Sequence, residues 1–436
     1  MTLVLPDWLV TSADVAPRQN WGLRVVDEIV VEVAPNSQLK AAHPGDDVVD
    51  AAGQVALPGF VNAHVHMYGV LAHGIPIETH PSGFWSFLED FWWPQVEDAL
   101  DAEMISAATA WACAEMVRSG ITSFYDILEA PNAVPEVLLA EREVVAKSGL
   151  RGILSFEATE RAGPEIAELG LAENTSFIEA CRNDRLISGL MCFHTTFTCS
   201  KDYIRRAFDL AAEYGVLTHA HCNEGVHEGE WCTENVGMRT LEYYEEMGVA
   251  GPGFLASQCV QLSDRELEII AATDMKVTHM PLANCEVGGG IAPIPELIDA
   301  GVTVGLGSDG YVNDFYEVMR GAFLLHKARL LDPGVMPAAA VLHMATEGGA
   351  AALGLDGVGR LDVGCSADLQ LVESSFPTPV REHNLLDQLV LWRNHGDVCD
   401  VMVAGEWRVR DREILGVDME QLRARVGEQA ERLWSG

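Results

Sequence analysis

Short apolar runs alternate with longer amphipathic stretches along most of this chain. The runs are rich in aliphatic and β-branched residues, whereas the stretches between them repeat apolar positions at helical spacing. This alternation is typical of successive strand–helix units, which assemble into a parallel sheet. Eight runs of strand type follow one another, at residues 57–66, 120–127, 151–159, 186–196, 215–224, 253–262, 275–281 and 301–309.

Segments with a helical pattern lie between these runs, for example at residues 102–119, 201–214, 264–273 and 295–300. Eight parallel strands with helices outside them close into a (β/α)8 barrel. We therefore predict an α/β fold whose catalytic domain is a TIM-type (β/α)8 barrel over residues 58–358.

The two ends of the chain have a different pattern, with short alternating strands, turn residues and few helical stretches. Two terminal β segments that flank a barrel pair most economically into one small sandwich. We predict a composite β-sandwich domain from residues 1–57 and 359–436, with an amphipathic helix over 415–434 near the end of the chain.

The composition is that of a globular protein, since 48% of the 436 residues are hydrophobic. The longest apolar runs are strand-sized, and residues 1–20 have neither a basic start nor an uninterrupted apolar stretch. The ten cysteines contain no CxxC pair, and several lie inside apolar runs. We expect a soluble, cytoplasmic protein without disulfides.

The formal net charge is −37, and lysine occurs at only five positions. Such a surface repels phosphate backbones and anionic membranes, so neither a nucleic acid nor a membrane is expected as a partner. The charge has two explanations that the sequence leaves open. One is an ordinary acidic, solvated surface, and the other is adaptation to high salt, where carboxylates keep the surface hydrated.

The strongest chemical signal is His64-Val65-His66, at the end of the first strand run. Two histidines at i and i+2 on a strand point to the same face and can chelate one ion. An HxH pair alone is weak, because chance or core packing explains it equally well. Active sites of barrels lie at the C-terminal strand ends, however, and His221 and Asp309 end the fifth and eighth runs.

These four side chains form a ligand set of three imidazoles and one carboxylate. Such a set suits one divalent metal, zinc or else iron(II), and leaves room for a water. Coordination lowers the pKa of that water from about 16 toward roughly 7. Glu224 follows His221 by three residues and can enter the pocket to protonate a ring nitrogen, or it is a solvated loop carboxylate.

With these residues in view, the chain resembles the cytosine deaminase and chlorohydrolase branch of the amidohydrolase superfamily, which includes the triazine hydrolases. The similarity spans nearly the whole chain. Within the branch the chain most resembles the SsnA-type aminohydrolases, through Trp92-Trp93 and residues 311–314. The motifs that carry the resemblance are residues 58–66, the HxxE of His221 and Glu224, residues 279–284 and residues 308–310.

The resemblance implies one metal bound by His64, His66, His221 and Asp309, with Glu224 as proton shuttle. It also implies hydrolytic deamination of an aminated nitrogen heterocycle of the purine, pyrimidine, pterin or triazine type. In this reaction a metal hydroxide attacks the amine-bearing carbon, and Asp309 passes the water's proton to the departing ammonia. Two alternatives stay open: hydrolysis of another C–N or C–Cl bond, and a metal-containing binding module without turnover.

One position departs from the family pattern. Family members usually carry a histidine on the sixth strand, and this chain has Gln258 there. Glutamine forms hydrogen bonds but cannot become a cation. If the histidine served as a charged stabiliser, its loss costs about 2 to 4 kcal/mol. We count Gln258 among the catalytic residues, and the retained Glu224 favours deamination over chloride displacement.

Other residues are expected near the substrate. His194 and His279 match positions that face the pocket, and we assign a catalytic role to His279 and substrate contact to His194 and Trp92, with core packing as the alternative. We assign His219 no role, and we expect a homo-oligomer. An aromatic run follows the first strand and could form a pocket wall for a flat heterocycle, a packed helix or a subunit interface: Phe84, Trp85, Phe87, Phe91, Trp92 and Trp93.

Overall fold

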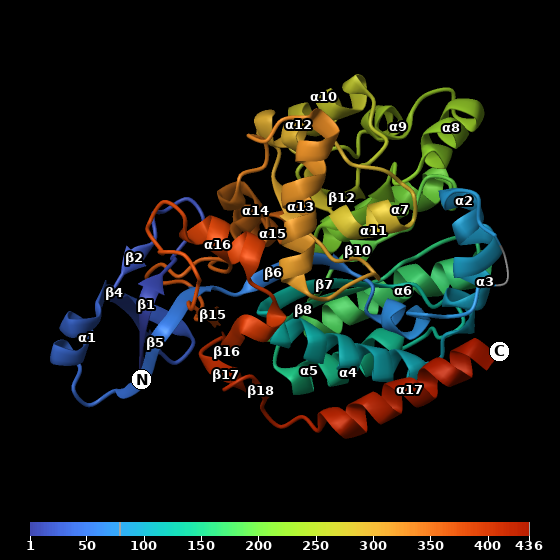
Figure 1. The fold of residues 1–436 in the computed structure, drawn as a ribbon. Helices are drawn as coiled ribbons and strands as arrows, with labels where there is room; N and C mark the ends of the chain where they lie inside the picture. Colours follow the sequence, from blue (N-terminus) through green and yellow to red (C-terminus); the bar gives the residue numbers. More distant parts are fainter. Residues whose placement is uncertain (78–79, 436) are drawn as a thin grey trace.

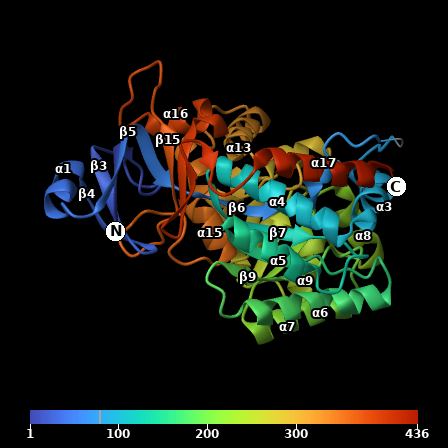
Figure 2. The ribbon, with the colours of Figure 1, turned by 90° about the horizontal axis from the view of Figure 1, so that it is seen from below.

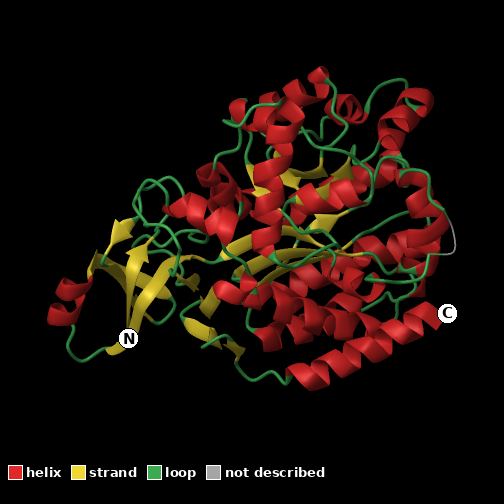
Figure 3. Ribbon diagram, viewed as in Figure 1, coloured by secondary structure: helices red, strands yellow, loops and turns green. Residues whose placement is uncertain are grey.

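The structure is a computed structural model that describes residues 1–77 and 80–435. Its central feature is a set of parallel strands surrounded by helices (Figures 1 and 3). These strands are β6 (Phe60–Val65), β7 (Ile121–Leu128), β8 (Arg151–Phe156), β9 (Ile187–Gly189) continued by β10 (Met191–Cys192), β11 (Thr218–Cys222), β12 (Phe254–Gln258), β13 (Lys276–His279) and β14 (Val304–Leu306).

The strands pair in two parallel sheets, β6-β7-β8-β9 and β10-β11-β12-β13-β14. Backbone contacts join the two sheets at both seams. Asp309 N, just after β14, donates to His64 O at 3.0 Å, and Ala158 forms a parallel bridge with Phe193. The chain order of the eight strands is therefore also their order around the barrel, as predicted.

Helices cover the outside of the barrel and begin where the sequence supplies caps. Asp101 accepts hydrogen bonds from two backbone amides at the start of α4, and Ser263 forms a capping box with Glu266 at the start of α10. The covering helices are α4 (Ala102–Arg118), α5 (Val137–Ser148), α6 (Pro164–Cys181), α7 (Lys201–Tyr214), α8 (Val226–Asn235), α9 (Thr240–Met247), α10 (Asp264–Thr273), α11 (Pro281–Glu286), α12 (Ile294–Asp299), α13 (Phe315–Leu330), α14 (Ala338–Met344) and α15 (Glu347–Leu353).

A segment of short helical turns lies between β6 and α4 and carries the aromatic run. It comprises η1 (Met67–Ala72), α2 (Phe84–Phe87), η2 (Leu88–Trp92), α3 (Trp93–Gln95) and η3 (Glu97–Ala99). Because this segment leaves β6 directly after His66, it reaches the C-terminal end of the barrel, where the predicted ligands lie.

A small β domain beside the barrel is built from both ends of the chain (Figure 1). Its nine-stranded sheet has the order β18-β17-β16-β15-β5-β1-β3-β4, with β2 paired to β1. Its elements are β1 (Thr2–Leu9), β2 (Arg18–Gln19), β3 (Trp21–Val26), β4 (Ile29–Pro35), α1 (Asn36–Ala42), β5 (Asp47–Pro58), β15 (Leu369–Glu373), β16 (Val398–Val403), β17 (Glu406–Arg410) and β18 (Glu413–Ile414).

The sheet encloses an apolar core of its own, in which Leu23 and Val30 from one end of the chain pack with Leu369 and Met402 from the other. An isolated bridge from Ile29 to Ser366 brings the far edge of the sheet back over this core. The predicted fold class, a barrel with a β domain from both termini, is confirmed.

The last helices contact the barrel. Helix α16 (Leu385–Trp392) and the turn η4 (His395–Asp397) lead back to the sheet, and α17 (Met419–Ser435) runs along α4 (Figure 2). Trp434 Nε1 donates to Leu71 O at 2.8 Å, within the turn η1 that follows β6. The domain boundaries given above stay a prediction.

Two further findings concern the whole of the described chain. Its ten cysteines are free thiols, nine of them buried. Among the described residues, no helix combines the length and the apolar character that a membrane span requires.

Candidate active site

Four side chains meet at the C-terminal end of the barrel. His64 and His66 come from β6 and its end, His221 from β11, and Asp309 from the loop after β14. The Nε2 atoms of His64 and His66 lie 3.3 Å apart, and oxygens of Asp309 lie 3.8 and 3.7 Å from them. The three histidines are buried and each offers a ligand atom to one small volume.

The three imidazoles are held in the neutral form, because burial lowers the pKa of His64, His66 and His221. His66 Nδ1 lies 2.6 Å from the carbonyl oxygen of Ile127, so this nitrogen carries the proton and Nε2 keeps its lone pair. Lone pairs turned toward one point repel each other unless a cation lies among them. The donor set therefore fits a divalent metal.

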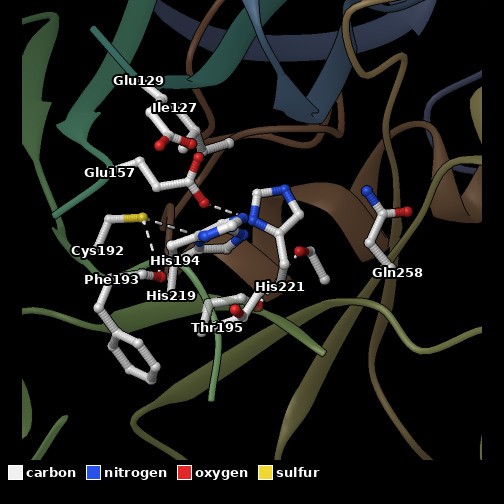
Figure 4. A network of polar contacts seen from close by, with 12 residues as sticks. Ile127, Glu129, Glu157, Cys192, Phe193, His194, Thr195, His219, His221 and Gln258 are labelled. Atoms are coloured by element: carbon white, nitrogen blue, oxygen red, sulfur yellow. Dashed lines mark hydrogen bonds and ion pairs between the residues drawn. The ribbon is translucent and has the colours of Figure 1, made fainter. Parts of the chain in front are cut away.

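Glu157, just after β8, lies behind this cluster. Its Oε1 is 2.6 Å from His221 Nδ1, a close contact that lacks the alignment of a hydrogen bond (Figure 4). Burial, and then the neighbouring Glu129, raise the pKa of Glu157. A carboxyl group at this position favours the ring orientation in which Nε2 of His221 faces the other ligands.

Two more buried carboxylates extend away from the ligands. Arg161 holds both, with Nε 2.8 Å from Glu129 and Nη2 2.9 Å from Glu97, while Nη1 pairs with Asp98 at 2.8 Å. Burial alone would raise the pKa of Glu129, but the guanidinium outweighs it and the pKa falls to about 2. Burial and Glu129 raise the pKa of Glu97, whose carboxyl accepts a hydrogen bond from Tyr68.

Glu224 lies two residues beyond β11, partly buried in the cavity wall. Burial raises its pKa well above the usual value, and the negative charge of Asp309 adds to the effect. Glu224 therefore keeps a proton to a higher pH than an exposed glutamate and can act as an acid.

Gln258 ends β12 with a left-handed backbone, φ 70°. Its Nε2 donates to Asp309 Oδ2 at 2.8 Å, and its Oε1 accepts from Nδ2 of Asn284. Asn284 thus sets which end of the amide faces Asp309, and Gln258 acts on the carboxylate as a neutral donor.

A cavity of about 600 Å³ opens in front of these residues. Trp92 lines it, whereas Trp85 stacks on His227 with ring centroids 4.0 Å apart and Trp93 lies under the guanidinium of Arg161 at 4.7 Å. The aromatic part of the wall consists of Tyr68, Phe84, Phe87, Phe91, Trp92 and Tyr311.

Two other histidines, His194 and His279, were predicted to face the pocket, and only His194 does. His194 lines the cavity, and burial lowers its pKa to about 3. His279 does not line it: its Nε2 lies 3.1 Å from His326 Nε2 on α13, so the expectation that it faces the pocket was wrong. On β13 this side chain packs against the outer helix layer. His219 Nδ1 contacts the thiol of Cys192 at 3.2 Å (Figure 4).

The sequence reasoning missed Glu97, Glu129, Glu157, Arg161 and Asn284. Glu129 and Glu157 had a usable signal, because each directly follows a buried strand, the same position that identified the metal ligands. Arg161 lies in the loop after β8 and Glu97 begins η3, and no pattern along the chain indicates that they pair with each other.

The family model of the amidohydrolase family matches residues 55–408. The chain belongs to the amidohydrolase family. The resemblance stated from its motifs is thereby confirmed, and the chain is a hydrolase that acts on C–N bonds.

Among the amidohydrolases similar in sequence is the 5-methylthioadenosine/S-adenosylhomocysteine deaminase of Syntrophobacter fumaroxidans, 34% identical over 91% of this chain and 90% of that protein. Another is the 5'-deoxyadenosine deaminase of Methanothermobacter thermautotrophicus, 32% identical over 88% of each chain.

Similar solved structures include an adenosine deaminase from Xanthomonas campestris with bound zinc, with TM-score 0.89, 24% identity and coverage of 100% of this chain and 99% of that one. A mutant of atrazine chlorohydrolase from Arthrobacter aurescens, complexed with zinc and atraton, has TM-score 0.87, 20% identity and coverage of 99% and 100%. At these identities the structural likeness describes the fold alone.

Proposed function

We propose that this amidohydrolase removes ammonia hydrolytically from an adenine nucleoside, with one divalent metal, zinc, bound by His64, His66, His221 and Asp309. The observation that carries the proposal is the acid Glu224, which faces the cavity beside a cluster of neutral imidazoles. The two sequence relatives named as deaminases of adenosine derivatives support the choice of adenine as the nucleobase of the substrate.

The metal supplies Lewis acidity when bound, which makes a water nucleophilic near neutral pH. Glu224 holds the proton that a ring nitrogen needs. Protonation of this nitrogen draws electrons from the neighbouring carbon, which then accepts the nucleophile. The raised pKa of Glu224 suits the task, since a general acid must still be protonated at the operating pH.

Asp309 transfers the second proton, which comes from the attacking water. One oxygen accepts from Gly310 N at 2.7 Å and the other from Gln258, so the carboxylate is fixed in rotation. From this position it takes the proton of the attacking water and returns it to the departing amine. Gln258 is a positioning residue in this scheme, which explains how the site works without a histidine cation there.

The cavity suits a purine in size and lining, because small-molecule sites commonly have volumes of about 300 to 1,000 Å³ and aromatic walls. The six aromatic side chains of the wall offer faces for a flat base. Within this wall, His194 and Trp92 are the residues we assign to substrate contact. His279 is not assigned a role, because it faces α13.

We also expect the enzyme to be a cytoplasmic homo-oligomer. Apolar side chains stand exposed on neighbouring helices, with Leu324 51% exposed, Leu331 90% and Trp392 59%. An interface between subunits would cover them. Sedimentation velocity of the purified protein measures the assembly state directly.

The experiment for the deaminase is release of ammonia by the zinc-replete protein. The panel comprises methylthioadenosine, 5'-deoxyadenosine, adenosine, guanine and a chlorinated triazine. We expect ammonia from at least one adenine nucleoside, with kcat lowered about 100- to 10,000-fold in Glu224→Gln. Glu230→Gln, at an exposed position on α8, is the matched control and should retain wild-type turnover.

Two results would overturn the proposal. Chloride release without ammonia release would make the protein a dehalogenating hydrolase. Tight binding of the nucleosides without turnover, in protein shown to contain its metal, would favour the binding-module alternative.

A further inference from the structure

Acidic side chains predominate over basic ones in the described wall of the active-site cavity. Among the residues that the structure describes, no lysine or arginine lines this cavity. The acidic side chains that line it are Glu97, Glu129, Glu157, Glu224, Glu286, Asp309 and Glu317.

Arg161, which lies close behind the wall, is not free to bind a substrate. Arg161 pairs through Nε, Nη1 and Nη2 with Glu129, Asp98 and Glu97, at 2.8 to 2.9 Å, and its guanidinium lies over the ring of Trp93. All its nitrogens are engaged, and its side chain is only 12% exposed. An anionic group of a ligand would have to break this network to reach it.

A bound divalent metal offsets the charges beside it, above all that of Asp309. The residues predicted to hold it lie at the C-terminal ends of the barrel strands, whereas Glu286 on α11 and Glu317 on α13 are exposed carboxylates of the cavity wall. Where Glu97 and Glu129 line the wall, Arg161 offsets the charge of Glu129, and the raised pKa of Glu97 favours its protonated form. The negative potential that a substituent of the heterocycle would meet therefore comes from the exposed carboxylates Glu286 and Glu317.

The aromatic faces of Phe84, Phe87 and Trp92 act in the same sense, because the face of an aromatic ring attracts cations and disfavours anions.

We infer that this cavity selects substrates by charge, accepting neutral or cationic aminated heterocycles and rejecting those with a carboxylate or phosphate substituent. The inference rests on the proposed deaminase function. It divides the substrates that the relatives' names suggest: methylthioadenosine and 5'-deoxyadenosine carry no charged group, whereas S-adenosylhomocysteine carries an ammonium group and also a carboxylate, for which the described wall has no lysine or arginine partner.

The test compares adenosine 5'-carboxamide with adenosine 5'-carboxylate, which differ in charge at nearly constant size, and adds 5'-amino-5'-deoxyadenosine as the cation. We expect kcat/KM for the carboxylate to be at least about 100-fold below that for the carboxamide, since like charges in a desolvated site repel strongly. The amine should be turned over at least as well as the carboxamide. Equal kcat/KM for carboxylate and carboxamide would overturn the inference.

A charge reversal identifies the source of the effect. Glu286→Lys should raise the ratio of carboxylate to carboxamide turnover about tenfold. Glu213→Lys, on the exposed surface of α7, makes the same change of charge outside the cavity wall and should leave the ratio unaltered. An equal rise in both variants would assign the effect to net charge rather than to the cavity.

Binding separates this inference from the deaminase proposal. Isothermal titration of the zinc-replete protein with inosine 5'-carboxamide and inosine 5'-carboxylate, the corresponding products, needs no turnover. Preference for the carboxamide supports charge selection even if none of the nucleosides releases ammonia, in which case only the proposed reaction fails. Equal affinity for the two products overturns charge selection whether or not ammonia is released.

Discussion

Gln258 Nε2 lies 2.8 Å from Asp309 Oδ2, so an amide at the end of β12 donates a hydrogen bond to the carboxylate that follows β14. The amide cannot turn over freely, because its oxygen accepts from Asn284. A reversed amide would place oxygen against carboxylate oxygen and leave both amide groups mismatched. The arrangement fixes one oxygen of a predicted metal ligand and base.

The first prediction follows from this contact. Gln258→Leu removes the donor and should lower kcat about 10- to 100-fold, the equivalent of a lost hydrogen bond to a charged group. Gln258→Glu keeps the shape of the side chain but sets a second carboxylate beside Asp309. Its kcat should therefore fall further than that of Gln258→Leu. Metal content, measured by elemental analysis, should stay at one ion per chain in Gln258→Leu.

Asn284→Ala tests the orienting contact separately. It leaves Gln258 in place but frees its oxygen, so its kcat should lie between those of wild type and Gln258→Leu. A wild-type kcat in Gln258→Leu would show that the hydrogen bond from Gln258 to Asp309 contributes nothing to turnover. Loss of metal from that variant would instead make Gln258 a ligand.

The arrangement of the ligands could be predicted because two simple periodicities determine it. Side chains alternate along a strand, so His64 and His66 had to share a face. Parallel strands end on one side of a barrel, so His221 and Asp309 had to come near them. Both arguments rest on strands whose apolar pattern is clear in the sequence, although Asp309 itself lies in the short loop after β14.

Other parts of the site depend on contacts that no local pattern records. His279 sits on a barrel strand as expected, but its side chain meets His326 on α13, and the sequence at β13 gave no sign of which layer it would join. Arg161, in the loop after β8, and Glu97, at the start of η3, are far apart in the chain. Their pairing is a tertiary property, as is the placement of Trp92 in the wall and of Trp93 outside it.

A second prediction concerns the metal. His221→Ala should reduce bound zinc from about one ion per chain to a small fraction, because it removes one of three neutral nitrogen donors. His219→Ala is the matched control, two residues earlier on β11. Its ring is also buried and contacts Cys192, but it does not belong to the ligand group. Full zinc content in His221→Ala, measured after dialysis against a weak chelator, would contradict the assignment.

The third prediction links the acid Glu224 to stability. Its folded-state pKa is raised above the unfolded value by burial and by Asp309, so the folded protein favours its protonated form. Ionisation of Glu224 therefore costs stability as the pH rises from the unfolded pKa through the folded one. Glu224→Gln should stabilise the metal-free protein at pH 8, by about 1 kcal/mol, while it abolishes most activity.

The pH dependence provides the check. The stabilisation by Glu224→Gln should vanish below about pH 4, where the glutamate is protonated in both states. Glu230→Gln, exposed on the neighbouring helix, should change the free energy of unfolding at neither pH. A Glu224→Gln protein less stable than wild type at pH 8 would mean that the carboxylate has a favourable partner in the folded state.

The last prediction addresses Arg161, whose guanidinium is the centre of the acidic network. Arg161→Met leaves Glu97 and Glu129 buried without a cation, and this should lower the free energy of unfolding by about 3 to 5 kcal/mol at pH 7.5 in urea denaturation. Arg161→Lys keeps the charge but cannot pair with three carboxylates through three separate nitrogens. Its free energy of unfolding should therefore fall by less than that of Arg161→Met.

Acid should reduce the deficit of Arg161→Met. In the wild type, Arg161 lowers the pKa of Glu129 to about 2, so this carboxylate stabilises the fold above its unfolded pKa and loses that effect only as the pH falls through the folded one. Without the guanidinium, burial raises the pKa, and protonation relieves the unpaired charge already at pH 5. The control is Arg206→Met, which breaks an exposed pair with Glu168 and should cost no more than about 1 kcal/mol at either pH. The loss of unfolding free energy in Arg161→Met could instead be small at pH 7.5, or grow on acidification. Either result would mean that Glu97, Asp98 and Glu129 share protons among themselves and do not need the arginine.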